Sequence, residues 1–136
     1  MATEGMVARI YGIAELRACP IETTFRIVGK RWTVLILREL FFGVTHFNRL
    51  QENVKGITPK ILSRRLKELQ RLRIVERLIV SQAPIRIEYR LTDLGRRLDS
   101  VLISAAAFSM ACLPKAVFKD GKPRELAVVV GRSRVP

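Results

Sequence analysis

Apolar residues recur every three or four positions along most of the chain, a spacing that is typical of amphipathic helices. Pro20 suits the first turn of a helix, and Gly29 and Gly43 stand where helices commonly end. We expect the helices on either side of Gly29 to be scaffold, with Trp32 in the core. The spacing predicts helices at about 6–16, 20–28, 31–42, 47–54 and 59–72.

The helix at 59–72 has two chemically different faces. Thr58 suits its N-cap and Pro59 its first position, and Gly56 allows a turn after the preceding helix. The pair is therefore typical of a helix-turn-helix, whose second helix packs through one face and attracts anions with the other. The apolar face holds Ile61, Leu62, Leu66, Leu69 and Leu72, and the opposite face holds Lys60, Ser63, Arg64, Lys67 and Arg71.

A short β segment follows this helix pair. β-Branched residues partly alternate with other side chains at 75–80 and 85–91, and the residues at 81–84 supply a turn that contains a proline. Thr92 then caps one long helix that we expect to run as far as Pro114. The predicted fold class is mainly α with a small β-hairpin, which is the arrangement of a winged helix-turn-helix.

The net charge of the chain indicates which class of partner it binds. The 136 residues include 25 Lys and Arg but only 12 Asp and Glu, a net charge of +13, and 49% are hydrophobic, which is enough for one core. Such a balance favours polyanions, either nucleic acid or anionic lipid. The longest nearly apolar run, at 101–113, is shorter than the roughly 20 residues that a bilayer requires. We therefore expect no membrane partner and a cytoplasmic location, because the N-terminus does not resemble a secretory signal.

The sequence contains few candidate residues for catalysis, metal binding or disulfide formation. Cys19 and Cys112 are too few for a disulfide scaffold, and with His46 as the single histidine a zinc cluster is not expected. No motif pairs a nucleophile with a base, and no glycine-rich loop is built to hold a phosphate. We therefore expect neither enzymatic activity nor a cofactor, and His46 to be a surface residue.

Four segments carry a resemblance to a known family. They are CPIE at Cys19, GKRWTVLILREL at Gly29, FNRLQENVKGITPKILSRRLKEL at Phe47 and IEYRLTDLG at Ile87. In order and spacing they resemble the HxlR-type transcriptional regulators, a branch of winged-helix proteins in bacteria and archaea. The resemblance implies a homodimer joined by the terminal helices, with the second helix of the motif in the major groove of DNA and the wing on the neighbouring backbone.

The resemblance also implies a division of the chain. Residues 1–18 would form an N-terminal helix at the dimer contact, 19–95 the winged helix-turn-helix, and 96–113 the C-terminal dimerisation helix. Residues 114–136 would be a basic tail that the resemblance does not explain. The apolar character of 101–113, with small residues from Ala105 to Ala107, also favours a dimer interface over an internal core helix.

Two functions remain open for the cationic helix face. A sequence-specific transcription regulator that binds double-stranded DNA is favoured, and a non-specific architectural nucleic-acid-binding protein is the alternative. The simplest alternative is that these cations form a solvent-exposed helix face that contacts no nucleic acid. In the hairpin, Arg77, Arg86 and Arg90 are either wing contacts to phosphate or ordinary exposed strand charges, and Arg86 is the preferred contact because it is nearest the tip. The sequence identifies no small-molecule effector. The predicted DNA-binding residues, about 59–72 in the recognition helix and about 75–91 in the wing, are Thr58, Lys60, Ser63, Arg64, Lys67, Arg71 and Arg86.

Three side chains carry further expectations. Arg65 lies at the edge of the apolar face, so its stem should pack while its charged head reaches water. Cys19 precedes the helix that Pro20 starts, where the positive helix end favours a reactive thiolate, and some relatives that the chain resembles sense oxidants through a cysteine at this place. A packed, inert Cys19 is the favoured alternative. Cys112 should be buried by its own apolar helix.

Overall fold

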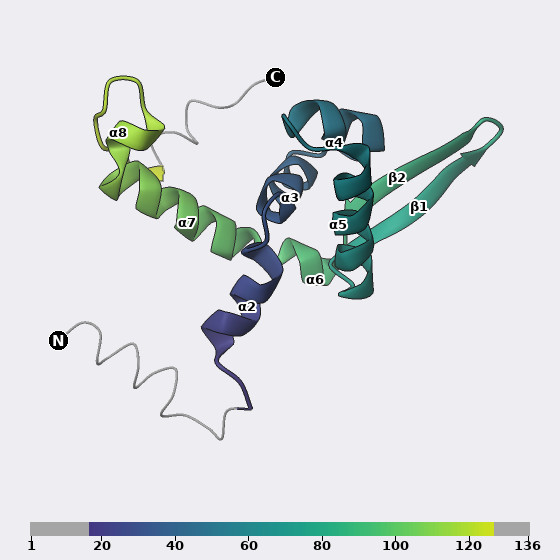
Figure 1. The fold of residues 1–136 in the computed structure, drawn as a ribbon, viewed down its shortest axis with the longest axis horizontal. Helices are drawn as coiled ribbons and strands as arrows, with labels where there is room; N and C mark the ends of the chain where they lie inside the picture. Colours follow the sequence, from purple (N-terminus) through teal and green to yellow (C-terminus); the bar gives the residue numbers. More distant parts are fainter. Residues whose placement is uncertain (1–16, 127–136) are drawn as a thin grey trace.

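The computed structural model describes residues 17–126, which form a small helical unit with one hairpin (Figure 1). The predicted helix at 6–16 lies outside the described residues. In chain order the elements are α2 (Pro20–Val28), α3 (Thr33–Phe41), α4 (Phe47–Asn53), α5 (Pro59–Arg71), β1 (Val75–Gln82), β2 (Ile85–Leu91), α6 (Asp93–Arg96), α7 (Asp99–Cys112) and α8 (Pro114–Val117). The helix pair α4 and α5 followed directly by the hairpin is a winged helix-turn-helix, which confirms the predicted fold class.

Local start signals explain where α5 and α3 begin. Thr58 is the N-cap of α5, as predicted, and its hydroxyl accepts a hydrogen bond from the amide of Ile61 at 3.3 Å. The expected start of α3 at Arg31 is wrong by two residues. Trp32 has a φ of 78°, in the left-handed region, so a right-handed helix can begin only after it.

The hairpin is longer than its sequence pattern indicated. β1 continues to Gln82, whereas we expected it to end at Val80, so the turn between the strands consists of Ala83 and Pro84. A register shift between Ile79 and Ser81 accommodates the extra residue, and antiparallel pairing resumes as far as the tip. The amide of Tyr89 in β2 donates to the carbonyl of Thr45 at 2.8 Å, which fixes the base of the hairpin beside the start of α4.

The predicted single helix from Thr92 to Pro114 is wrong, because it is broken into α6 and α7. The amide of Gly95 donates to the Thr92 hydroxyl at 3.0 Å, so the predicted cap is present. Gly95 lies so close to β1 that an added Cβ would be 2.1 Å from the carbonyl oxygen of Ile74. Next, the amides of Arg97 and Leu98 bond carbonyls three residues back, a tightened turn that ends α6.

One apolar core holds the helix-turn-helix and the base of the hairpin together. Glu39 is a buried carboxylate at this core, and it is paired with the guanidinium of Arg38 at 2.8 Å and with the side-chain amide of Asn53 at 2.8 Å. This pairing ties α3 to the end of α4. The buried apolar residues of the core are Val28, Ile36, Leu37, Leu40, Leu50, Val54, Ile57, Leu62, Leu66, Leu69, Ile74, Val75 and Leu91.

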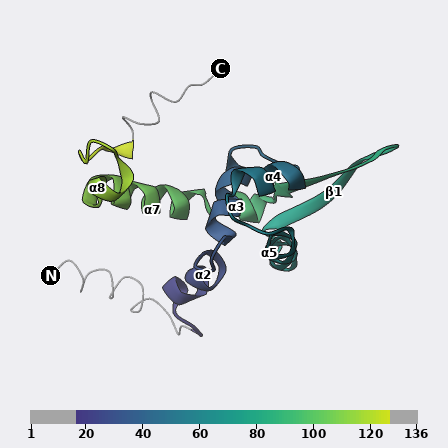
Figure 2. The same cartoon turned by 45° about the horizontal axis from the view of Figure 1, so that its top comes forward.

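α7 leaves this unit on the side opposite the hairpin, as Figure 1 and Figure 2 both show. Leu98 and Leu102 pack partly against the core, but within α7 only Met110 is buried. Cys112 is exposed, so its expected burial is wrong; the apolar helix has nothing packed on that side within the described chain. Within residues 17–126, no helix combines the length and the apolar character that a membrane crossing needs.

The described part of the basic tail folds back onto the end of α7. The amide of Arg124 donates to the Met110 carbonyl at 3.1 Å, and its guanidinium lies 4.0 Å from the centre of the Phe118 ring. The same guanidinium pairs with Asp120 at 2.7 Å. The hydrogen bond from the Lys122 amide, with the Arg124 guanidinium, holds the pKa of the Asp120 carboxyl below its ordinary value. Residues 114–126 are therefore a folded extension of α7.

Candidate nucleic-acid interface

The cationic residues of α5 are turned outward because its apolar residues are fixed in the core. Leu62, Leu66 and Leu69 are at most 1% exposed, so the opposite face must point to solvent. The apolar face ends there, since Leu72 is exposed instead of buried as the helix projection predicted. A single shallow depression on the outer face is lined by Lys60, Ser63, Arg64, Lys67 and Arg71, which are the five residues that the sequence placed together.

Thr58 has a different place from these five. Its hydroxyl is engaged in capping α5, and it stands at the end where the helix presents its unpaired amides. Such an amide end, with Lys60 in the first turn, attracts anions. The start of α5 therefore lies next to Lys60, which belongs to the cationic face.

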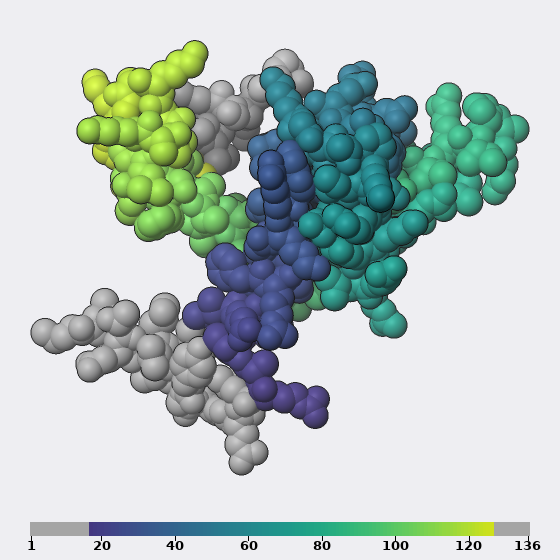
Figure 3. Space-filling view, in the orientation of Figure 1, coloured from purple at the N-terminus to yellow at the C-terminus, as the bar shows by residue number. Residues whose placement is uncertain are grey.

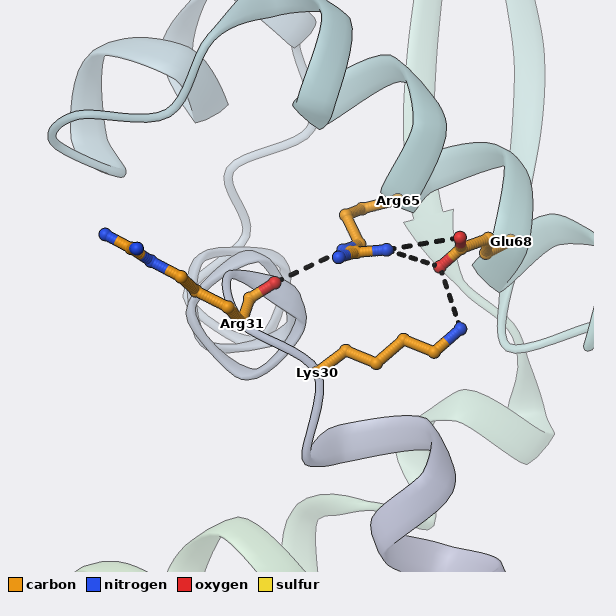
Figure 4. A network of polar contacts seen from close by, with 4 residues as sticks. All are labelled: Lys30, Arg31, Arg65 and Glu68. Atoms are coloured by element: carbon orange, nitrogen blue, oxygen red, sulfur yellow. Dashed lines mark hydrogen bonds and ion pairs between the residues drawn. The ribbon is translucent and has the colours of Figure 1, made fainter.

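Arg65 does not contribute to that surface, and the expectation that its head reaches water is wrong. Its side chain is only 15% exposed, and Nη1 donates to both carboxylate oxygens of Glu68, at 3.2 and 3.0 Å. Nε donates to the backbone carbonyl of Arg31 at 3.2 Å, as Figure 4 shows. Arg65 therefore turns toward the segment between α2 and α3.

Glu68 is a residue that sequence reasoning missed. Burial raises the pKa of its carboxyl, but the hydrogen bonds and charges of Arg65 and then Lys30 outweigh burial and hold the pKa below its ordinary value. The i,i+3 spacing of Arg65 and Glu68 was a usable signal for their pairing. The contact from Lys30 was not predictable in this way, because it joins residues 38 positions apart.

In the hairpin the three candidate arginines are placed differently. Arg90 is paired with Glu88 in its own strand, at 2.5 Å. Arg77 is exposed near the base, where it stands opposite Tyr89. Arg86 is exposed one residue beyond the start of β2 and lines a depression together with Asn48 of α4. Figure 3 shows the hairpin projecting from the body beside α5, so Arg86 is the arginine carried furthest outward.

Cys19 stands apart from this surface, at the N-cap of α2. It is partly buried, and its carbonyl accepts hydrogen bonds from the amide and the hydroxyl of Thr23, both at 2.9 Å. Among residues 17–126, His, Cys, Asp and Glu side chains nowhere gather in a group that could hold a metal ion. The candidate site therefore consists of the cationic α5 surface and the hairpin, and Cys19 lies outside it at the start of α2.

Known proteins share this arrangement. Residues 27–116 match the HxlR-like helix-turn-helix family. The HTH-type transcriptional regulator MT3179 of Mycobacterium tuberculosis is 42% identical over 100 residues, which are 74% of this chain and 61% of that protein. The HTH-type transcriptional regulator YodB of Bacillus subtilis is 37% identical over 92 residues, 67% of this chain and 82% of YodB.

Solved structures agree with the sequence matches. The reduced form of YodB superposes with a TM-score of 0.62 at 36% identity, and covers 68% of this chain and 91% of YodB. The reduced form of the redox regulator HypR superposes with a TM-score of 0.63 at 29% identity, covering 66% of this chain and 89% of HypR.

Proposed function

Because this chain belongs to the HxlR-like helix-turn-helix family, we propose that it is a sequence-specific DNA-binding transcription regulator that acts as a homodimer. The observation that carries the proposal is the two-sided α5. Its leucines are buried in the core, and its outer surface gathers cations and a hydroxyl on one face. A helix held in this way presents its cations on a rigid surface. The major groove of DNA is wide enough to admit an α-helix.

The chemistry of each side chain assigns its role on DNA. Arg64 lies near the middle of the outer face and can donate two parallel hydrogen bonds to O6 and N7 of a guanine. Lys60, Lys67 and Arg71 neutralise phosphates, and Ser63 donates to a phosphate or a base edge. The amide end of α5 beside Thr58 binds a further phosphate. Arg86 carries the wing's contact to the neighbouring backbone.

Dimerisation is supported by apolar side chains that the single chain leaves in water. In α2, Ile21 and Phe25 are exposed, and in α7 Ile103 and Phe108 are exposed beside the small residues Ala105 and Ala106. Exposed apolar side chains grouped on a helix in this way mark protein contacts. A two-fold axis would place the two α5 helices about 34 Å apart, one turn of DNA, on a near-palindromic operator.

The test of this proposal begins with a genomic footprint of the protein, which yields the operator. Affinity is then measured for one operator duplex and for a shuffled duplex of equal length and composition, at one fixed salt concentration. A sequence-specific regulator binds the operator at least about a thousandfold more tightly. Equal affinity for the two duplexes would support the architectural alternative and remove the proposed regulator.

We propose in addition that oxidation of Cys19 changes DNA affinity. Cys19 caps α2, the helix that carries part of the apolar surface assigned to the dimer. YodB has been solved in reduced and diamide-treated forms, and HypR in reduced and oxidised forms. In the proposed step two thiols lose two protons and two electrons to diamide and form one disulfide, either between the two Cys19 residues or with a small thiol.

The exposure of Cys112 decides how this second proposal is tested. An exposed thiol reacts with diamide whatever its role, so the titration is done on the Cys112→Ser protein. We expect diamide to change operator affinity in Cys112→Ser and to leave the Cys19→Ser/Cys112→Ser protein unaffected. If both proteins respond alike, or neither responds, Cys19 is a structural residue.

A further inference from the structure

The segment between α2 and α3 reaches across to the middle of α5. Nζ of Lys30 lies 3.4 Å from Oε2 of Glu68, and the carbonyl of Arg31 accepts from Nε of Arg65 at 3.2 Å. Arg65 closes the group by binding both oxygens of Glu68. Figure 4 shows the side chains of Lys30, Arg65 and Glu68 meeting between the two chain segments, with the backbone carbonyl of Arg31 facing Arg65 and the Arg31 side chain pointing away. Glu68 therefore binds cations from two parts of the chain, one in its own helix and one 38 positions away.

The same segment also braces the turn that precedes α5. Trp32 has a left-handed φ of 78°, and a Cβ added to Gly56 would lie 3.4 Å from Cη2 of its ring. The guanidinium of Arg31 covers this ring at 4.6 Å from its centre. Residues 30–32 consequently lie against the middle of α5 and against the turn before it, and these contacts add to the buried leucines in holding α5 in its orientation.

Among the described residues, α2 packs against the core at the end that leads into this segment. Val28 is buried and Ile27 packs partly against the core, whereas Ile21 and Phe25 are exposed. A contact that displaced α2 would therefore act on residues 30–32 first. From there it would reach Glu68 through Lys30 and Arg65 through the Arg31 carbonyl.

The charge of Glu68 is unexpected on this helix. It is the one acidic residue among residues 59–71, which include five Lys and Arg. A carboxylate so placed repels phosphates, so if charge alone mattered its removal would strengthen binding to every DNA sequence. Two cations hold this carboxylate in place, which points to a role in orienting α5 that outweighs the repulsion.

We infer that Glu68 is a positioning residue for operator recognition, which with Lys30 and Arg65 couples the placement of α2 to the orientation of α5. The inference rests on the proposed function and adds to it the route by which a contact at α2 alters DNA affinity. Its distinctive consequence is an opposite effect on two kinds of DNA. Loss of the Glu68 charge weakens binding to the operator, where the orientation of α5 matters. Binding to shuffled DNA stays the same or becomes stronger.

The experiment measures affinity for the operator and the shuffled duplex at one salt concentration, using full-length wild type, Glu68→Gln and Lys30→Met. Glu125→Gln is the charge-matched control, because Glu125 is exposed and lies in the extension after α7. We expect Glu68→Gln and Lys30→Met each to lower the operator-to-shuffled affinity ratio by about tenfold. Glu125→Gln should leave the ratio unchanged. The Lys30→Met/Glu68→Gln double variant should lose no more than the larger single loss, because both changes break one link.

Each outcome decides a different point. A Glu68→Gln protein that binds both duplexes more tightly by one common factor acts through charge alone, which overturns the inference and leaves the proposed function standing. Additive losses in the double variant overturn the link between Lys30 and Glu68. If Glu68→Gln does not fold, Lys30→Met decides, since Lys30 lies outside α5 and is half exposed; a wild-type ratio then overturns the inference. A wild type with equal affinity for both duplexes removes the proposed function itself.

Discussion

α5 and α7 are both rich in apolar residues, yet they use them in opposite ways. In α5 the buried leucines lie on one face, and every cation except Arg65 is on or near the other. In α7 apolar residues surround the helix, and Ile103 and Phe108 remain 49% and 59% exposed. A helix that is apolar on one face completes its burial within its own chain, whereas one that is apolar all round needs a second surface. The outer face of α5 is therefore available for a polyanion, and that of α7 for an apolar partner.

The largest effect that follows from this contrast is expected from Ala106→Asp in α7. If α7 forms the dimer interface, two-fold symmetry buries two unpaired carboxylates together, at a cost of about 3 to 5 kcal/mol in dimerisation free energy. Sedimentation equilibrium should show dimer for the wild type and monomer for Ala106→Asp. Ala83→Asp makes the same change at the exposed hairpin tip and should stay dimeric. A monomeric wild type would refute the dimer.

A smaller effect on the free energy of unfolding is expected from Leu66→Ala in α5. Leu66 is fully packed, so its truncation should lower the free energy of unfolding by about 3 kcal/mol. Ile103→Ala removes a similar volume from the exposed surface of α7 and should cost less than about 1 kcal/mol in dilute protein. Urea denaturation at low protein concentration measures both. Equal losses in the two variants would contradict the contrast between the helices.

The polar face of α5 should show a smaller effect, in DNA binding alone. Arg64→Ala should weaken operator binding by about 2 kcal/mol and relax preference at one operator position, if Arg64 reads a base. Lys67→Ala should weaken all sequences alike and reduce the salt dependence by about one charge, if Lys67 meets phosphate. Binding titrations over a series of single-base operator variants distinguish the two roles. Unchanged affinity in both variants would show that this face is solvated and nothing more.

The smallest expected effect is the contribution of Glu68 to the pH dependence of the free energy of unfolding. Its pKa in the folded chain lies below the ordinary 4.5, so the unfolded chain takes up the proton first as pH falls. The resulting stabilisation, less than about 1 kcal/mol for a partly exposed pair, is fully present above pH 4.5 and is lost as pH falls through the folded pKa. Urea denaturation of wild type and Glu68→Gln at a series of pH values should show this difference disappearing in acid. A difference that persists unchanged below that range would contradict it.

Features set by neighbouring residues were predictable from sequence, and features set by distant ones were not. The bounds of α2, the Thr58 cap and the two faces of α5 depend on residues a few positions apart, and each was predicted correctly except for Leu72, which is exposed. The break between α6 and α7, a tightened turn at Arg97 and Leu98, comes just after Gly95 packs against Ile74, about twenty positions earlier, and periodicity carries no trace of that contact. Arg65 illustrates the same limit within the candidate site. Its position on the helix was clear, but the carbonyl of Arg31 that receives it was not.

The position within α7 at which the helix leaves the core marks a natural graft boundary for protein engineering. Up to Leu102 the chain is tied into the core, and beyond it the helix projects as a separate arm. Replacing the arm after Leu102 with an unrelated self-associating helix would leave Gly95, the Thr92 cap and α5 untouched. The spacing between two recognition modules would then be set by the length and crossing angle of the new helix. One fold could thus be adapted to operators of different spacing without altering any residue assigned to base recognition.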